Sequence, residues 1–186
     1  MTTGVKLRTF EARDLNAVLR LNKESVHYLS PMDEDRLHTL LACDAQLTIA
    51  EYDGEVAGFL ITFADGSDYD SVNYRWFARH LKDFTYIDRI VIDQAYRGKG
   101  IGQQFYASLK QTLEQTHKQT LEQTQNAGRS PCLWLAAEID IEPRNDRSLA
   151  FHKQQGFAEV ATQSAGQGKQ VSLQVLSISG ATNQRQ

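Results

Sequence analysis

Residues 87–102 read IDRIVIDQAYRGKGIG. An apolar run at 90–92 leads into a turn with glycines at 98, 100 and 102, and a segment rich in helix-forming residues follows. The first turn of a helix has unpaired N–H donors and a dipole that favours negative charge, and glycine lets a backbone approach an anion closely. With Arg97 and Lys99 in the same turn, this stretch predicts a strand, a phosphate-binding loop and a helix.

Two better-known glycine motifs do not fit this turn. The dinucleotide-binding motif needs G-x-G-x-x-G and an acidic residue about 20 positions later, and the spacing here is different. The phosphate loop of nucleotidases needs G-x-x-x-x-G-K-[ST], which the chain does not contain. A purely structural interpretation, in which the glycines only let a helix N-terminus pack closely, is the alternative.

A second motif lies at 145–157, NDRSLAFHKQQGF. It has Asn145, a small residue three positions later at Ser148, and a short helical segment that ends at Gly156-Phe157. In their sequence and order, the two motifs resemble the signatures of the GNAT N-acetyltransferase superfamily. The resemblance covers about residues 5–178. More narrowly, the chain resembles an uncharacterised branch of predicted acetyltransferases that share the NYRWF stretch at 73–77.

The resemblance implies a single α/β (α+β) domain over 1–178, followed by a polar tail at 179–186. Its central sheet would be mixed and mostly antiparallel, with about seven strands flanked by helices and with strands four and five parallel and splayed. The sequence pattern predicts strands at 5–10, 47–52, 55–63, 84–92, 131–140, 157–160 and 171–177, with a hairpin at Asp53-Gly54. It predicts helices of about 12–16 residues from Asp14, and at 33–41, 74–81, 103–125 and 145–155.

The resemblance also implies acetyl-CoA as co-substrate and no metal. The backbone at 90–92 would bond the pantetheine arm, the turn at 97–102 would hold the pyrophosphate, and the second motif would lie along the rest of the cofactor. The residues implied are Ile90, Val91, Ile92, Arg97, Gly98, Lys99, Gly100, Ile101, Gly102, Asn145, Ser148, Phe151, His152 and Lys153.

Acetyl transfer to an amine needs a base for the ammonium proton and a donor for the developing oxyanion. Glu138 is the first candidate base, because it lies on the polar face of the strand after the long helix, and Asp88 is the second. Each could instead belong to a structural ion pair. Many relatives place an acidic tyrosine where this chain has His152, so the acid is His152, Tyr86 or solvent, and His152 could simply pack the helix.

Residues 65–83, DGSDYDSVNYRWFARHLKD, form an insertion where relatives usually have a simple hairpin connection. Its aromatic residues Tyr69, Tyr74 and Trp76 are candidates for acceptor binding, and the amine would enter near 20–33 and 65–77. In the alternative interpretation a helix here packs Trp76 and its neighbour into the core. The aspartates at 65, 68 and 70 are compatible with a cationic acceptor, or are simply solvated.

Composition narrows the remaining possibilities. A chain of 186 residues with 41% hydrophobic and 23% charged residues is typical of one globular domain, and a net charge of −3 argues against a general nucleic-acid binder. There is no apolar run of about 20 residues and no signal-peptide pattern at the start, so neither membrane nor nucleic acid is expected as a partner. Cys43 and Cys132 have no metal-binding spacing and are expected to be buried free thiols in a cytoplasmic protein. Many relatives are dimers, so a homodimer is compatible with the resemblance.

The sequence therefore predicts an acyl-CoA N-acyltransferase. It would transfer the acetyl group of acetyl-CoA to a primary amine of a small molecule or peptide by direct attack in a ternary complex. The alternative is a non-catalytic acyl-CoA sensor or interaction module. The duplicated octapeptide at 111–118 and 119–126, QTLEQTHK and QTLEQTQN, is interpreted as a solvated extension of the long helix.

Overall fold

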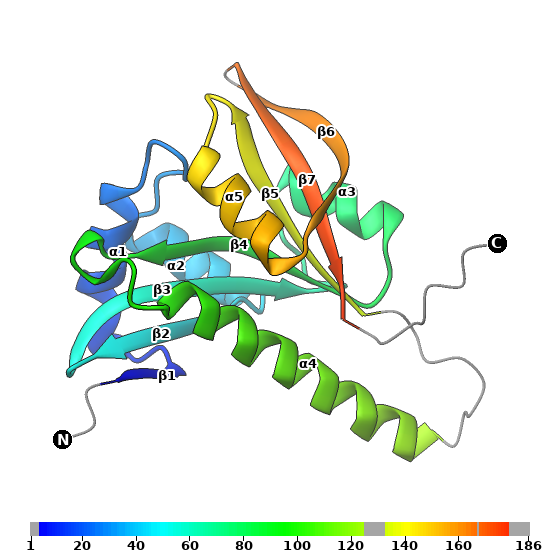
Figure 1. Ribbon diagram of the computed structural model, residues 1–186, viewed down its shortest axis with the longest axis horizontal. Coiled ribbons are helices and arrows are strands. Elements are labelled where there is room, and N and C mark those ends of the chain that lie inside the picture. Colours follow the sequence, from blue (N-terminus) through cyan, green and yellow to red (C-terminus); the bar gives the residue numbers. More distant parts are fainter. Residues whose placement is uncertain (1–3, 125–132, 167, 179–186) are drawn as a thin grey trace.

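We describe a computed structural model of the chain over residues 4–124, 133–166 and 168–178. Its described strands form one seven-stranded sheet in the order β1-β2-β3-β4-β5-β7-β6 (Figure 1). The β4–β5 pair is parallel and the other pairs are antiparallel. This confirms the predicted mixed sheet. The strands are β1 Val5–Thr9, β2 Gln46–Tyr52, β3 Glu55–Ala64, β4 Phe84–Ile92, β5 Trp134–Glu142, β6 Ala158–Gly166 and β7 Lys169–Ser177.

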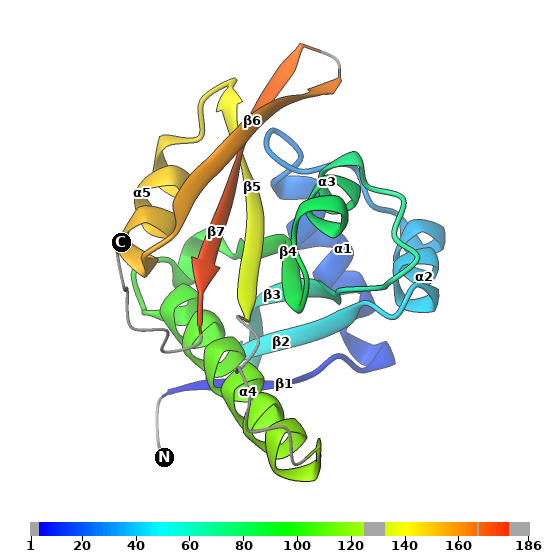
Figure 2. The same ribbon diagram turned by 90° about the vertical axis from the view of Figure 1, so that its right-hand side faces the viewer.

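Helices cover both faces of the sheet, as Figure 2 shows. On one side lie α1, α2 and α3, over an apolar cluster that includes Phe59, Phe77 and Tyr86. On the other side lie α4 and α5, over a second cluster that includes Phe105 and Leu135. The helical segments are η1 Ala12–Asp14, α1 Leu15–Glu24, α2 Glu34–Ala42, α3 Val72–His80, η2 Gln94–Tyr96, α4 Ile101–Thr124 and α5 Asp146–Gln155. None of the described helices is both long enough and apolar enough to cross a membrane.

The predicted turns form for the expected local reasons. Asp53 and Gly54 both have positive φ, 52° and 87°, as the two-residue turn of a β2–β3 hairpin requires. Asn145 caps α5 by accepting a hydrogen bond from the Ser148 backbone N–H at 3.1 Å. Gly156 ends the helix in the left-handed conformation, with φ of 93°.

Several predicted boundaries differ from the observed ones. The first helix stops at Glu24 and does not continue toward 29, and β6 extends to Gly166 and not just to 160. The backbone of the second octapeptide is helical to Thr124. Its side chains and the predicted helix end at 126–128 lie outside what the structure describes, as do Cys132 and the tail at 179–186. Cys43 is a free thiol that is half-buried.

The sheet opens between its two parallel strands. β4 and β5 pair over four positions, from Phe84 opposite Trp134 to Ile87 opposite Ala137, and then separate. On its other edge, β4 has a bulge against β3, because Thr62 pairs with Ile87 while its neighbour pairs with Arg89. Asp88 is therefore the extra residue. The bulge and the separation of the strands occur at the same level of the sheet.

Candidate active site

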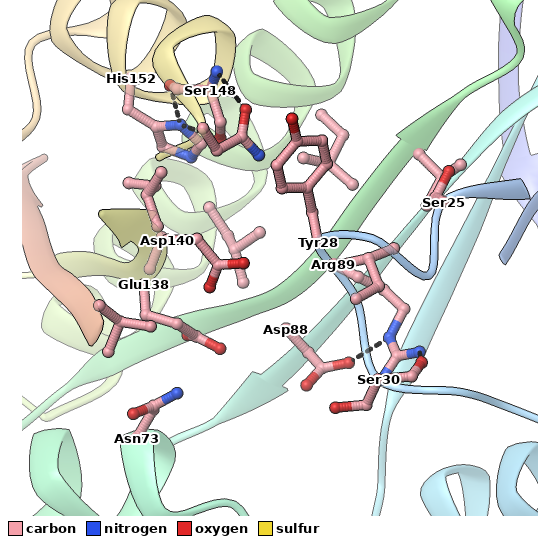
Figure 3. A pocket seen from close by; sticks show the side chains of 18 of the residues that line it. Ser25, Tyr28, Ser30, Asn73, Asp88, Arg89, Glu138, Asp140, Ser148 and His152 are labelled. Carbon is pink, nitrogen blue, oxygen red and sulfur yellow. Dashed lines mark hydrogen bonds and ion pairs between the residues drawn. The ribbon is translucent and has the colours of Figure 1, made fainter. Parts of the chain in front are cut away.

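A cavity of about 810 Å³ occupies the gap between the separated strands. Its walls come from β4, β5, the start of α5, the loop between α1 and α2, and the segment that leads into α3. Figure 3 shows Asp88 and Glu138 facing this space, with Tyr28, Ser148 and His152 on the far side. The cleft therefore joins the two halves of the site that the sequence predicts.

The edge of β4 presents unpaired backbone groups to the cleft. Asp93 donates its backbone N–H to the Ala57 carbonyl on β3 at 2.9 Å. Backbone groups of successive residues in a strand point to opposite sides. Val91 therefore also faces β3, whereas the N–H and C=O groups of Ile90 and Ile92 face the side from which β5 has withdrawn. An extended ligand can bond to them as an added strand.

The glycine turn leaves a run of free amides. Within the described part of the chain, the first backbone hydrogen bond of α4 runs from Gln104 to Gly100 at 3.0 Å, and no N–H from 98 to 103 donates to a backbone carbonyl. Gly98 and Gly100 have positive φ, 78° and 77°, which turns successive N–H groups outward. Arg97 is exposed and lines the cleft. The turn thus has the donors and the charge that a pyrophosphate needs.

Some residues of this turn pack against the protein and do not face the cleft. Gly102 packs closely, since a Cβ there would meet the Phe151 ring at 3.1 Å and Ile92 at 3.3 Å. Ile101 is buried in the core. Lys99 turns away from the cleft, with its ammonium 4.8 Å from the centre of the Tyr52 ring. Of the predicted cofactor residues, those that line the cleft are Ile90, Val91, Ile92, Arg97, Asn145, Ser148, Phe151 and His152, whereas Gly98, Lys99, Gly100, Ile101, Gly102 and Lys153 do not.

Glu138 lies at the apex of the cleft. Ala137 is the last residue of β5 that pairs with β4, so Glu138 is the first residue beyond the seam. Its carboxyl accepts a hydrogen bond of 2.5 Å from the Tyr86 hydroxyl. Burial raises the pKa of Glu138 to about 7, although hydrogen bonds from Tyr86 and Asn73 oppose this shift. A carboxyl with such a pKa can accept a proton near neutral pH.

Asp88 faces the same space but is fully engaged. Arg89 donates to one of its oxygens at 2.6 Å, and the Tyr69 hydroxyl donates to the other at 2.5 Å. Arg89 is itself buried, and it also donates to the Asn22 side chain at 2.7 Å and to the Ser30 carbonyl at 3.3 Å. The structure thus gives Asp88 the ion pair that the sequence left as its alternative role.

His152 and Tyr86 are poorly placed to donate a proton to a ligand. His152 is 3% exposed, and its two ring nitrogens contact the Tyr106 hydroxyl at 2.6 Å and the Ser148 carbonyl at 2.8 Å. These partners fix Nδ1 as the donor and Nε2 as the acceptor, and burial lowers the pKa of the ring. Tyr86 is completely buried, and burial raises the pKa of its hydroxyl. Packing is therefore what the contacts of His152 support.

The aromatic insertion contributes less to the cleft than predicted. Tyr69 lines it, stacked on Phe63 with ring centres 4.0 Å apart. Tyr74 is buried, donates to the Ala64 carbonyl at 2.8 Å and does not line the cleft. Trp76 also lies outside it, because its ring stacks on His80 at 4.0 Å and packs against the core. Helix packing, the alternative interpretation, accounts for both.

Several cleft residues are not among the site residues predicted from the sequence, and three of them are Asn73, Tyr28 and Arg89. Asn73 is the second residue of α3 and contacts Glu138, while its side-chain oxygen accepts from Gln163 on β6. Tyr28 lines the cleft because α1 ends early and leaves it in a loop. Arg89 lines the cleft while it pairs with Asp88. No local sequence signal identifies Asn73, because its contacts are with Glu138 and Gln163, far along the chain.

Solved structures with the same fold include several acetyltransferases. The ribosomal-protein-S18-alanine N-acetyltransferase of Escherichia coli is 18% identical, with a TM-score of 0.64 over 98% of this chain and 99% of that one. A Salmonella typhimurium protein described as an acetyltransferase, with its cofactor acetyl-CoA, is 15% identical, with a TM-score of 0.63 over 98% of both chains. Ard1 from Thermoplasma volcanium is 15% identical, with a TM-score of 0.68 over 94% and 97%. No protein of curated function matches the sequence.

A family model agrees with the fold. The model described as the acetyltransferase (GNAT) family matches residues 13–131, which include the glycine turn and both strands of the hairpin. The second motif at 145–157 lies beyond the matched range, and its support comes from the structure of α5. Members of this family transfer acyl groups from acyl-CoA. The chain therefore belongs to the acetyltransferase (GNAT) family and is an acyl-CoA N-acyltransferase.

Proposed function

We propose that the enzyme transfers the acetyl group of acetyl-CoA to a primary amine, by direct attack of the amine while both substrates are bound. The observation that carries this proposal is the position of Glu138, which lies at the apex of the cleft with a pKa of about 7. A base of this kind can take the proton of an ammonium as the amine becomes a nucleophile.

The donor half of the site fits acetyl-CoA in its backbone chemistry. The free amides at 98–103 and the Arg97 side chain would hold the pyrophosphate, and the open edge at Ile90 and Ile92 would hold the pantetheine arm. Asn145 and Ser148, at the start of α5, would line the same arm. Acetyl-CoA supplies a thioester carbonyl that an amine can attack.

The remaining groups would stabilise the oxyanion, position the base and protonate the leaving thiol. A backbone N–H of β4 would stabilise the oxyanion that forms on the thioester carbonyl. Tyr86 and Asn73 hold the Glu138 carboxyl in place. A thiol has a pKa near 8.5, so the leaving sulfur needs little assistance, and solvent at the open cleft would supply its proton, since both His152 nitrogens are engaged.

The wider context follows from the same proposal. We place the catalytic unit within 1–178 as one domain, because the strands β1 to β7 all belong to one sheet. Use of acetyl-CoA as donor favours a cytoplasmic enzyme. The acceptor would be a primary amine of a small molecule or of a peptide.

Release of free thiol from acetyl-CoA in the presence of a panel of primary amines tests the proposal. We expect at least one amine to give thiol above the hydrolysis background, and Glu138→Gln to lower that rate about 100-fold, the usual contribution of a positioned base. Glu142→Gln removes an exposed carboxylate from the same strand and serves as the control. Tight binding of coenzyme A without turnover of any amine would instead favour the non-catalytic sensor.

A further inference from the structure

The acceptor half of the cleft has apolar walls that solvent reaches. Among the described residues, the exposed large hydrophobic side chains are Val26, Tyr28, Val72 and Val160. Two of these, Tyr28 at 47% and Val72 at 58% exposure, line the cleft together with Leu29. Figure 3 shows the Tyr28 ring projecting into the space above Arg89. Covering such surface stabilises a complex by about 25 cal/mol per Å², so these walls favour an apolar ligand group.

The fixed charges around the cleft are mostly neutralised in pairs. Asp88 pairs with Arg89 at 2.6 Å, and Asp140 with Lys169 at 3.1 Å. At the rim, Arg36 pairs with Asp70 at 2.7 Å. This last pair uses one of the three aspartates that suggested a cationic acceptor, and neither Asp65 nor Asp68 lines the cleft. The insertion therefore does not provide an acidic surface at the entrance.

One ionisable carboxyl is left over. Within the part of the chain that the structure describes, Glu138 is the one cleft-lining carboxyl with no cationic partner. The unpaired cleft cations, Arg97 and Arg147, lie by the glycine turn and at the start of α5. The site can thus compensate one ammonium group. A second ammonium would lie against Tyr28 and Val72 with Arg36 nearby, where no free anion would compensate its desolvation.

Most polar groups of the acceptor walls are also in use. Ser71 caps α3 by accepting from the Tyr74 N–H at 3.3 Å, and the Ser30 carbonyl accepts from Asn22 and from Arg89, both at 3.3 Å. The side-chain oxygen of Asn73 accepts from Gln163. A peptide backbone in this half of the cleft would find few free partners for its own N–H and C=O groups.

We infer that the acceptor is a small primary amine with a single positive charge, carried on a compact alkyl or aromatic group. This rests on the proposed function and specifies its second substrate. The ammonium meets Glu138, and the apolar group covers Tyr28, Leu29 and Val72. The apolar walls favour an acceptor with an apolar group, and the lack of a second unpaired carboxylate among the described cleft residues disfavours an acceptor with a second ammonium.

The test compares pentylamine with 1,5-diaminopentane, which differ in one terminal ammonium group. Thiol release at saturating acetyl-CoA should give pentylamine a kcat/KM at least about tenfold higher, equivalent to about 1.4 kcal/mol. 2-Phenylethylamine should behave like pentylamine, and spermidine and an alanine-initiated peptide like the diamine. A diamine, spermidine or peptide that equals or exceeds pentylamine overturns the inference alone. No thiol release with any amine overturns the proposed function as well.

A pair of variants tests the wall itself. Val72→Glu places a carboxylate beside the proposed apolar group, at the first position of α3, where acidic residues are favourable. It should lower kcat/KM for pentylamine and reduce the ratio of the kcat/KM values of pentylamine and 1,5-diaminopentane. Val160→Glu is the matched control, since Val160 is 50% exposed but outside the cleft. Equal effects of Val72→Glu and Val160→Glu on kcat/KM for pentylamine contradict the inference. Tyr28→Ala, which should raise KM for pentylamine, provides the same test if Val72→Glu does not fold.

Discussion

Replacing Glu138 by glutamine should remove a pH dependence from both the stability and the activity of this enzyme. In the folded state, burial raises the pKa of this carboxyl from 4.5 to about 7. Glutamine keeps the size and the hydrogen-bonding capacity of the protonated acid but cannot titrate. The difference between the two proteins therefore isolates the ionisation of one group.

The sign of the stability effect follows from where the proton is held. Below pH 4.5 Glu138 is protonated in both the folded and the unfolded chain, and the folded state has its full advantage. Between pH 4.5 and about 7 the unfolded chain has lost the proton while the folded chain keeps it, so the free energy of unfolding decreases as pH rises. At about 1.4 kcal/mol for each tenfold difference in proton affinity, the total loss is about 3 kcal/mol, most of which falls between pH 5 and pH 8.

Urea unfolding of wild type and Glu138→Gln at pH 5, 6, 7 and 8 measures this loss. The free energy of unfolding of wild type should fall relative to that of the variant by about 2–3 kcal/mol over this range. In parallel, kcat/KM should rise through pH 7 in wild type and lack that rise in the variant. Glu142→Gln, which loses an exposed carboxylate, should follow wild type in both assays. A stability difference that does not change with pH would refute the assignment of a carboxyl whose pKa is raised on folding.

Three further substitutions test the architecture around the cleft. Arg89→Met should lower the free energy of unfolding by about 3–5 kcal/mol, since it leaves a buried aspartate without its cation; urea unfolding that shows less than 1 kcal/mol would contradict this. Gly58→Ala should be destabilising by about 1–3 kcal/mol or more, because its Cβ would lie 2.5 Å from a β4 carbonyl oxygen; Gly4→Ala, whose Cβ would meet no atom within 4 Å, is the steric control in the same thermal-unfolding assay. Tyr106→Phe should cost about 1 kcal/mol by removing the donor to His152, and unchanged thermal stability would show that this bond contributes nothing.

Much of the fold could be predicted because its signals are local. The apolar strand before the glycine turn, the Asp53-Gly54 hairpin and the Asn145 cap each depend on neighbouring residues. The position at which α1 ends depends instead on residues that are distant in the sequence. Its apolar pattern continues to Leu29, but Leu29 packs against the core from a loop. What holds that loop is the Asn22 side chain, which contacts Ser30 and, 67 residues along the chain, Arg89.

The same distinction explains what could be predicted of the site. Alternation along β5 is enough to place Glu138 on the face opposite Leu135, so the candidate base could be chosen from sequence. Its contacts with Tyr86 and Asn73 depend on the parallel register of β4 and β5 and on the path of the insertion. Aromatic content alone could not separate Tyr69, which lines the cleft, from Trp76, which stacks on a neighbouring histidine.

The short seam between β4 and β5 has a consequence for how occupancy of the enzyme can be observed. Past Ile87 the backbone amides of Ile90 and Ile92 face the gap, so water can reach them in the ligand-free protein. A donor that completes the sheet would shield them, whether or not an amine is present. Slowed amide hydrogen exchange at these two positions on addition of coenzyme A would therefore report the fraction of enzyme that has bound the cofactor, with no need for turnover.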